Sequence, residues 1–105
     1  MTLMQFPNIE ESARKLGYSY SNNGPVYAPV YEYKKISGDI EHKISVTPHL
    51  GYATVEYLRL EGGRTVEHSH GKLEKRVDPR QDTRKLLDIL TDPSNHKWVS
   101  SSLDR

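Results

Sequence analysis

A run of β-branched residues and tyrosines between Val26 and His70, interrupted by turn-forming residues, constrains the fold of this chain most strongly. Segments of this composition and spacing are typical of a β-meander. We predict four strands, at 26–35, 39–47, 52–61 and from residue 64 onward. Pro29 falls within the first strand and cannot donate a ladder hydrogen bond, so we expect that strand at a sheet edge or at a bulge.

The second predicted strand alternates most clearly. One set of alternate positions is mostly apolar and consists of Ile40, His42, Ile44 and Val46. The positions between them carry charged or hydroxyl side chains. A period of two places these two sets on opposite faces of a sheet, so this strand is predicted to bury one face.

The pair Gly62-Gly63 predicts a two-residue hairpin loop, because glycine accepts the positive φ that such loops need. A regular ladder beyond this loop pairs Tyr57 with His68. Two residues further on, it pairs Val55 with His70. This register predicts that both histidines share a face with a set of apolar residues, namely Ala53, Val55, Tyr57 and Val66.

A short helix is predicted before the β-rich region, at 8–17. Asn8 and Glu11 have the spacing of a capping box, in which each side chain bonds the other residue's backbone amide. Gly17 can end the helix in the left-handed conformation. The turn-forming residues 21–25 then predict a loop.

A second helix is predicted after the β-rich region, at 78–91. Asp78 and Gln81 have capping-box spacing, and Pro79 is preorganised for the first helical position. The predicted fold class is therefore α+β: a short N-terminal helix, an antiparallel meander sheet of about four strands, and a C-terminal helix packed on the sheet.

The chain has 105 residues and a mean hydropathy of −0.78, which fits a single domain with one modest core. We expect this domain to span 1–105, with an arm at 1–7, the sheet within 26–70 and a mostly polar tail at 92–105 that contains Trp98. The sequence has no long apolar stretch and no secretory signal, so we expect a soluble, cytoplasmic protein without a membrane partner.

The charge balance is nearly neutral, with 15 Lys and Arg against 14 Asp and Glu. The absence of Cys excludes disulfide scaffolds, thiol nucleophiles and Cys-ligated metals. The segment 72–85 is biased, because six basic residues there outnumber three acidic ones. The candidate binding residues of this basic stretch are Lys72, Lys75, Arg76, Arg80 and Arg84.

All seven tyrosines lie within the first 57 residues. Tyrosine is enriched in protein interfaces, because its ring gives a large contact area and its hydroxyl a hydrogen bond. We assign Tyr27, Tyr31, Tyr33 and Tyr57 to a binding face on the sheet. The same side chains also suit the core of a small sheet that has little Phe. An open sheet edge can also pair with a second copy, so a homodimer is an alternative.

Binding of single-stranded nucleic acid is a further alternative. Several tyrosines lie close in sequence to Lys34, Lys35 and Lys43, and sheets with aromatic and basic side chains can stack unpaired bases. The nearly neutral net charge and the lack of an RNP-like motif argue against this interpretation.

One short segment has a distinctive spacing of Gly, His and Glu. Five residues separate Gly62 from His68, one separates His68 from His70, and three separate His70 from Glu74. This spacing resembles the first conserved motif of the cupins, in which two His and a Glu bind a divalent metal. The resemblance implies that His68, His70 and Glu74 bind such a metal as cofactor. It covers 13 residues, and Gln81 stands where the cupin motif has a glycine.

The sequence contains no Gly-x-Ser-x-Gly elbow, phosphate-binding Walker loop, dinucleotide fingerprint or His-Glu-x-x-His motif. It therefore favours a non-enzymatic protein that needs no cofactor. We expect a small binding module, an adaptor or an inhibitor, that occludes or bridges a protein partner. The tyrosine-bearing sheet and the basic C-terminal stretch are its expected contact surfaces.

Overall fold

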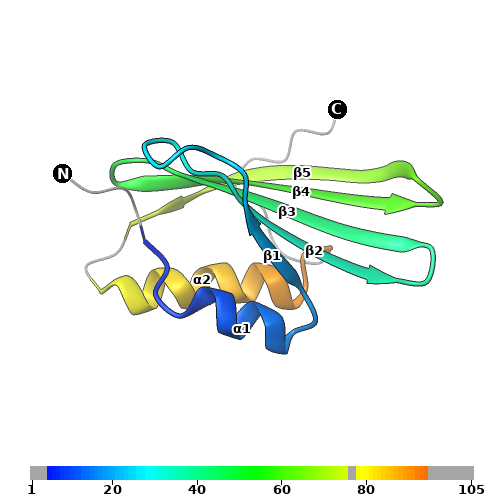
Figure 1. Ribbon diagram of the computed structural model, residues 1–105, viewed down its shortest axis with the longest axis horizontal. Helices are drawn as coiled ribbons and strands as arrows, with labels where there is room; N and C mark the ends of the chain where they lie inside the picture. Colours follow the sequence, from blue (N-terminus) through cyan, green and yellow to red (C-terminus); the bar gives the residue numbers. More distant parts are fainter. Residues whose placement is uncertain (1–4, 76–77, 95–105) are drawn as a thin grey trace.

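The computed structural model of the chain describes residues 5–75 and 78–94 and has two layers (Figure 1). One layer is a five-stranded antiparallel sheet in the order β1-β2-β3-β4-β5, and the other consists of two helices on one face of that sheet. The predicted α+β fold class is confirmed, but the sheet has five strands instead of four. Residues 1–4 of the predicted arm and 95–105 of the predicted tail, which include Trp98, lie outside the described residues.

The elements follow one another as helix, five strands and helix. Their bounds are α1 Ile9–Lys15, β1 Ser19–Asn22, β2 Tyr31–Ser37, β3 Ile40–Pro48, β4 Tyr52–Glu61, β5 Arg64–Glu74 and α2 Pro79–Thr91. The β1–β2 loop (residues 23–30) and the β3–β4 turn (49–51) lie at one end of the sheet, which we call the loop end. The two-residue turns at 38–39 and 62–63 form the opposite, hairpin end, where the strands extend beyond the helices (Figure 1).

β1 is a short edge strand where the sequence predicted a loop. It pairs antiparallel with β2, with Tyr20 opposite Tyr33. Its four residues carry a single large side chain, that of Tyr20, so the segment is too short and polar to show an alternating pattern. The pairing with β2, and not the local sequence, therefore makes this segment a strand.

β2 begins at Tyr31, five residues later than predicted. Residues 23–30 form the loop that joins it to β1. Pro29 is buried in that loop, so its expected place in an edge strand or at a bulge is wrong.

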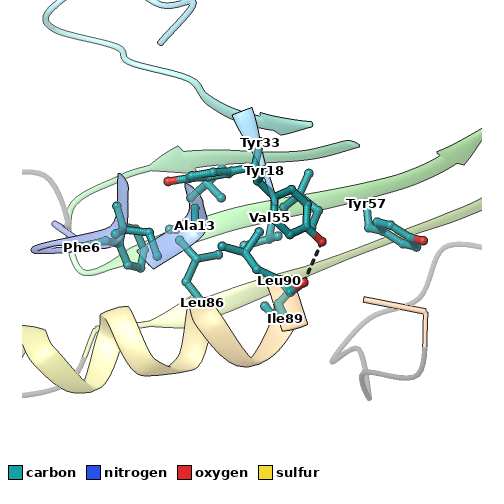
Figure 2. Close-up of a cluster of buried hydrophobic side chains, with 13 residues drawn as sticks. Phe6, Ala13, Tyr18, Tyr33, Val55, Tyr57, Leu86, Ile89 and Leu90 are labelled. Atoms are coloured by element: carbon teal, nitrogen blue, oxygen red, sulfur yellow. Dashed lines mark hydrogen bonds between the residues drawn. The ribbon is translucent and has the colours of Figure 1, made fainter. Parts of the chain in front are cut away.

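The core lies between the sheet and the helices (Figure 2). Tyr33 of β2 and Tyr57 of β4 are fully buried there. They pack in one cluster with the buried α2 residues Leu86, Ile89 and Leu90. Burial of a large apolar side chain stabilises the fold by about 1.5–3 kcal/mol, so this cluster is the main source of stability.

The two helices begin differently. At α2 the Asp78 side chain accepts a hydrogen bond from the Arg80 amide, as expected of an N-cap. At α1 the predicted capping box is wrong, because Asn8 has a φ of 63° and its side chain makes no capping hydrogen bond. Gly17, with a φ of 96°, follows the end of α1 in the left-handed conformation, as predicted.

A β-bulge changes the register between β4 and β5. Leu60 faces Thr65, but Arg59 faces Glu67, so Val66 is an extra residue in β5. Beyond the bulge His68 faces Leu58, not Tyr57. The slip of one residue turns every later side chain of β5 to the opposite face. The prediction that both histidines share the buried face with Tyr57 is therefore wrong.

Candidate partner-binding surface

The structure separates the four tyrosines that were predicted to form one binding face. Tyr33 and Tyr57 have no exposed surface. They belong to the core, which corrects their assignment to a binding face. Tyr31 is half-buried and stacks on Tyr20, with 5.9 Å between the ring centroids. Tyr27 lies on the β1–β2 loop and is 84% exposed.

Hydrogen bonds close the base of the β1–β2 loop. The Asn23 amide donates to the Val30 carbonyl at 2.8 Å and so closes the loop. The Asn22 side-chain oxygen accepts a hydrogen bond of 3.2 Å from the Gly24 amide, an arrangement typical of an Asx turn. The Asn23–Val30 bond continues the β1–β2 register by one residue pair, and the chain leaves the ladder beyond it.

Close backbone packing inside the loop explains why residue 24 is a glycine. A Cβ atom at this position would lie 2.2 Å from the Ala28 carbonyl oxygen and 2.7 Å from the Val30 nitrogen. Both contacts are too short for any side chain, and both are with backbone atoms that cannot rotate away. The sequence of the loop therefore encodes its compact shape.

The tip of this loop presents two large apolar side chains to solvent. The Ala28 amide donates to the Pro25 carbonyl at 3.0 Å and forms a turn around the tip. Within this turn Val26 is 96% exposed and Tyr27 is 84% exposed. Neither residue belongs to the core cluster, so their side chains add little to folding stability.

The β3–β4 turn lies at the same end of the sheet and adds Leu50, a third exposed apolar residue. The Lys75 amide donates to the Gly51 carbonyl at 3.0 Å, which brings the chain after β5 next to this turn. The Lys72 ammonium lies 5.2 Å from the ring centroid of Tyr52. We call the set Val26, Tyr27, Leu50, Lys72 and Lys75 the loop-end surface.

The loop-end surface is small enough for one partner to cover. Three strand spacings of about 4.8 Å separate β2 from β5, so the strand ends beside this surface span roughly 15 Å. A standard protein interface buries about 800 Å² per partner, which corresponds to a wider patch than this.

The predicted basic residues are exposed where the structure describes them. Lys72, Lys75 and Arg84 make no ion pair with another described residue. Arg80 is paired with Asp78 at 3.2 Å. Hydrogen bonds from the Arg80 amide and then from its side chain lower the pKa of Asp78. Arg76 lies outside the described residues.

The structure brings the predicted metal ligands together only in part. The rings of His68 and His70 are 6.2 Å apart on the open face of the sheet. His68 Nε2 lies 2.8 Å from Glu56 Oε2, whereas Glu74 is four residues beyond His70, or about 13 Å along the strand. Within residues 5–75 and 78–94, no three acidic or histidine side chains are placed to hold a metal ion. Metal binding stays a prediction.

Sequence reasoning missed a polar cluster at the hairpin end of the core. His42 Nδ1 lies 2.8 Å from the Tyr57 hydroxyl, which lies 3.0 Å from the Ser94 hydroxyl. Burial lowers the pKa of His42, and the nearby cations of Lys35 and Arg59 lower it further. The signal was present in the sequence, since His42 occupies an apolar position in an alternating strand.

Comparisons with known protein families, with curated proteins and with solved structures give no match. No helix in the described part of the chain is long and apolar enough to cross a membrane. The function is therefore inferred from the geometry of the described residues.

Proposed function

We propose that this protein is a non-enzymatic binding module, an adaptor or inhibitor, that binds a protein partner through the loop-end surface. The observation that carries the proposal is the hydrogen-bonded β1–β2 loop, which exposes Val26 and Tyr27 at its tip. A rigid loop loses little conformational entropy when it binds. An exposed aromatic ring on such a loop is the kind of anchor that dominates interface energies.

The chemistry of the surface indicates what the partner offers. Val26 and Tyr27 fit an apolar pocket, and Lys72 and Lys75 favour acidic side chains beside it. Charges at the rim of an interface mainly accelerate association. We therefore expect the association rate to fall as salt screens these lysines.

Nucleic-acid binding receives less support from the same geometry. Lys34 and Lys43 lie 3.8 Å and 3.6 Å from the carboxylates of Glu41 and Glu32, which neutralise them. Tyr33, one of the tyrosines that this alternative needs on the surface, is fully buried. Protein binding is thus the function that the arrangement supports best.

Quantitative affinity capture with loop variants tests the proposal. The full chain serves as bait in wild-type form, as the double variant Val26→Ala/Tyr27→Ala, and as Ile36→Ala. Ile36 is 66% exposed but lies at the hairpin end, so it is a matched control. We expect one protein to be enriched by the wild type and by Ile36→Ala, and to bind the double variant at least tenfold less tightly once purified.

Two results would contradict the proposal: equal capture by all three baits, or equal loss with Ile36→Ala and with the double variant. A charge reversal at Lys75 extends the test to the basic rim. Lys75→Glu is expected to slow association with the purified partner severalfold at low salt. Lys15→Glu changes an exposed lysine at the end of α1 and is expected to leave the association rate unchanged.

A further inference from the structure

A solvent-open cavity of about 550 Å³ lies between the start of α1 and the β1–β2 edge of the sheet. Neither Val26 nor Tyr27 lines it, so it is distinct from the loop tip. Its lining includes Phe6, Glu10, Glu11, Arg14, Tyr20 and Tyr31.

One wall of the cavity is aromatic. Tyr20 and Tyr31 stack with 5.9 Å between their ring centroids and 23° between their planes. The ring of Tyr20 is also 5.3 Å from that of Tyr33, which lies deeper in the core. The faces of aromatic rings carry negative charge density and attract planar cations.

The Tyr33 hydroxyl is a polar group without a hydrogen-bond partner among the described residues, although its side chain is fully buried. In Figure 2 this hydroxyl points away from Tyr57, on the side where Phe6 lies. Burial raises its pKa most, and Tyr20, Tyr31 and Glu10 raise it further. These three residues line the cavity but Tyr33 does not, so its buried hydroxyl lies outside the cavity lining.

The opposite side of the cavity carries carboxylates. Glu10 forms an ion pair with Arg14, so one guanidinium of the chain itself already bonds a carboxylate at this cavity. Glu11 is exposed and makes no ion pair with any described residue. The cavity lining therefore has one uncompensated carboxylate and one stacked aromatic pair.

We propose that this cavity binds the guanidinium group of an arginine side chain presented by another molecule. A guanidinium is planar and stacks on tyrosine, and its five N–H groups can donate to a carboxylate at the same time. An ammonium matches the charge but not the planar stack. The site does not depend on the loop-end surface, so it stands or fails independently of the proposed function.

Titration of the 15N-labelled full chain with N-acetyl-arginine amide, followed by NMR, tests the inference. We expect saturable shift changes at Glu11, Tyr20 and Tyr31 in the millimolar range. The matched control is N-acetyl-citrulline amide, which has nearly the same shape without the charge and is expected to cause no saturable change. Equal shifts with both compounds, no saturation with arginine, or changes centred elsewhere would overturn the proposal.

Variants separate the contributions of the cavity. Glu11→Gln removes an exposed charge and is expected to weaken arginine binding about fivefold. Tyr33→Phe removes only the buried hydroxyl, which does not line the cavity, and is expected to leave arginine binding unchanged. Lys15→Gln removes a charge on α1 at a residue that does not line the cavity, and should leave the affinity unchanged. Unchanged affinity in Glu11→Gln would contradict the inference even if Tyr33→Phe failed to fold.

Discussion

The hydroxyl groups of the buried tyrosines differ in what they bond. The Tyr18 hydroxyl donates to the Leu90 carbonyl at 2.7 Å, whereas the Tyr33 hydroxyl has no partner among the described residues. Burial raises the pKa of Tyr18 to about 12, so its hydroxyl stays a donor at neutral pH. A buried hydroxyl that makes a hydrogen bond stabilises the fold, while one that makes none costs desolvation energy.

Phenylalanine substitutions at these two positions should therefore have opposite effects. Tyr18→Phe leaves the Leu90 carbonyl without its donor and is expected to lower the free energy of unfolding by about 1–2 kcal/mol. Tyr33→Phe is expected to raise it by about 1 kcal/mol, because an unbonded hydroxyl is removed. Urea unfolding of both variants checks this, and a loss of stability in both would contradict the assignment.

His42 should make stability depend on pH. Because burial, Lys35 and Arg59 hold its pKa below the ordinary value of about 6.5, the unfolded chain takes up this proton first as the pH falls. The free energy of unfolding should thus decrease as the pH falls through about 6.5, and His42 should contribute no further change below its folded pKa.

The pH effect is measured by urea unfolding at pH 7.5 and pH 5 for wild type and His42→Gln. The variant is expected to lose less stability between these two pH values, because Gln does not titrate. An identical loss in both proteins, or an NMR midpoint for His42 above 6.5, would show that the environment of this ring has been misassigned.

At the level of elements, α2 was predictable because its signals are local. Asp78 and Pro79 mark its start, and the structure has the helix at Pro79–Thr91. The β1 strand and the β4–β5 bulge were not predictable in this way. Both depend on pairing with another strand, and no local pattern distinguishes Val66 as the extra residue. The bulge alone was enough to reverse the predicted face of His68 and His70.

The β1–β2 loop is the element on which the proposed function depends, and Gly24 is expected to control its shape. Gly24→Ala should lower the free energy of unfolding by about 2–3 kcal/mol, since its Cβ would overlap the Ala28 carbonyl. Gly51→Ala is the control, because its Cβ meets no atom within 4 Å and only its φ of 85° is unfavourable, at about 1–2 kcal/mol.

Two readouts check this prediction. Urea unfolding gives the stability of each variant, and 15N NMR shows which residues move. Gly24→Ala should shift the amide signals of residues 23–30, while Gly51→Ala should shift those of the β3–β4 turn. A Gly24→Ala variant as stable as wild type with unshifted loop signals would mean that the loop is not closely packed.

At the level of the whole molecule, the sequence predicted the layers better than the binding surface. Periodicity indicated the meander and the helix on it, because a buried face leaves an alternating pattern. It did not separate tyrosines in the core from tyrosines on the surface, because an amphipathic side chain fits both environments. Tyr33 and Tyr57 proved to be core residues, and Tyr27 is exposed.

The account depends most on the claim that the loop end contacts a partner and the hairpin end does not. Site-specific photocrosslinking compares them directly, with p-benzoylphenylalanine placed at Tyr27 in one protein and at Ile36 in another. We predict a covalent adduct with one protein from position 27 and none with that protein from position 36. The same adduct from both positions, or from position 36 alone, would contradict the account.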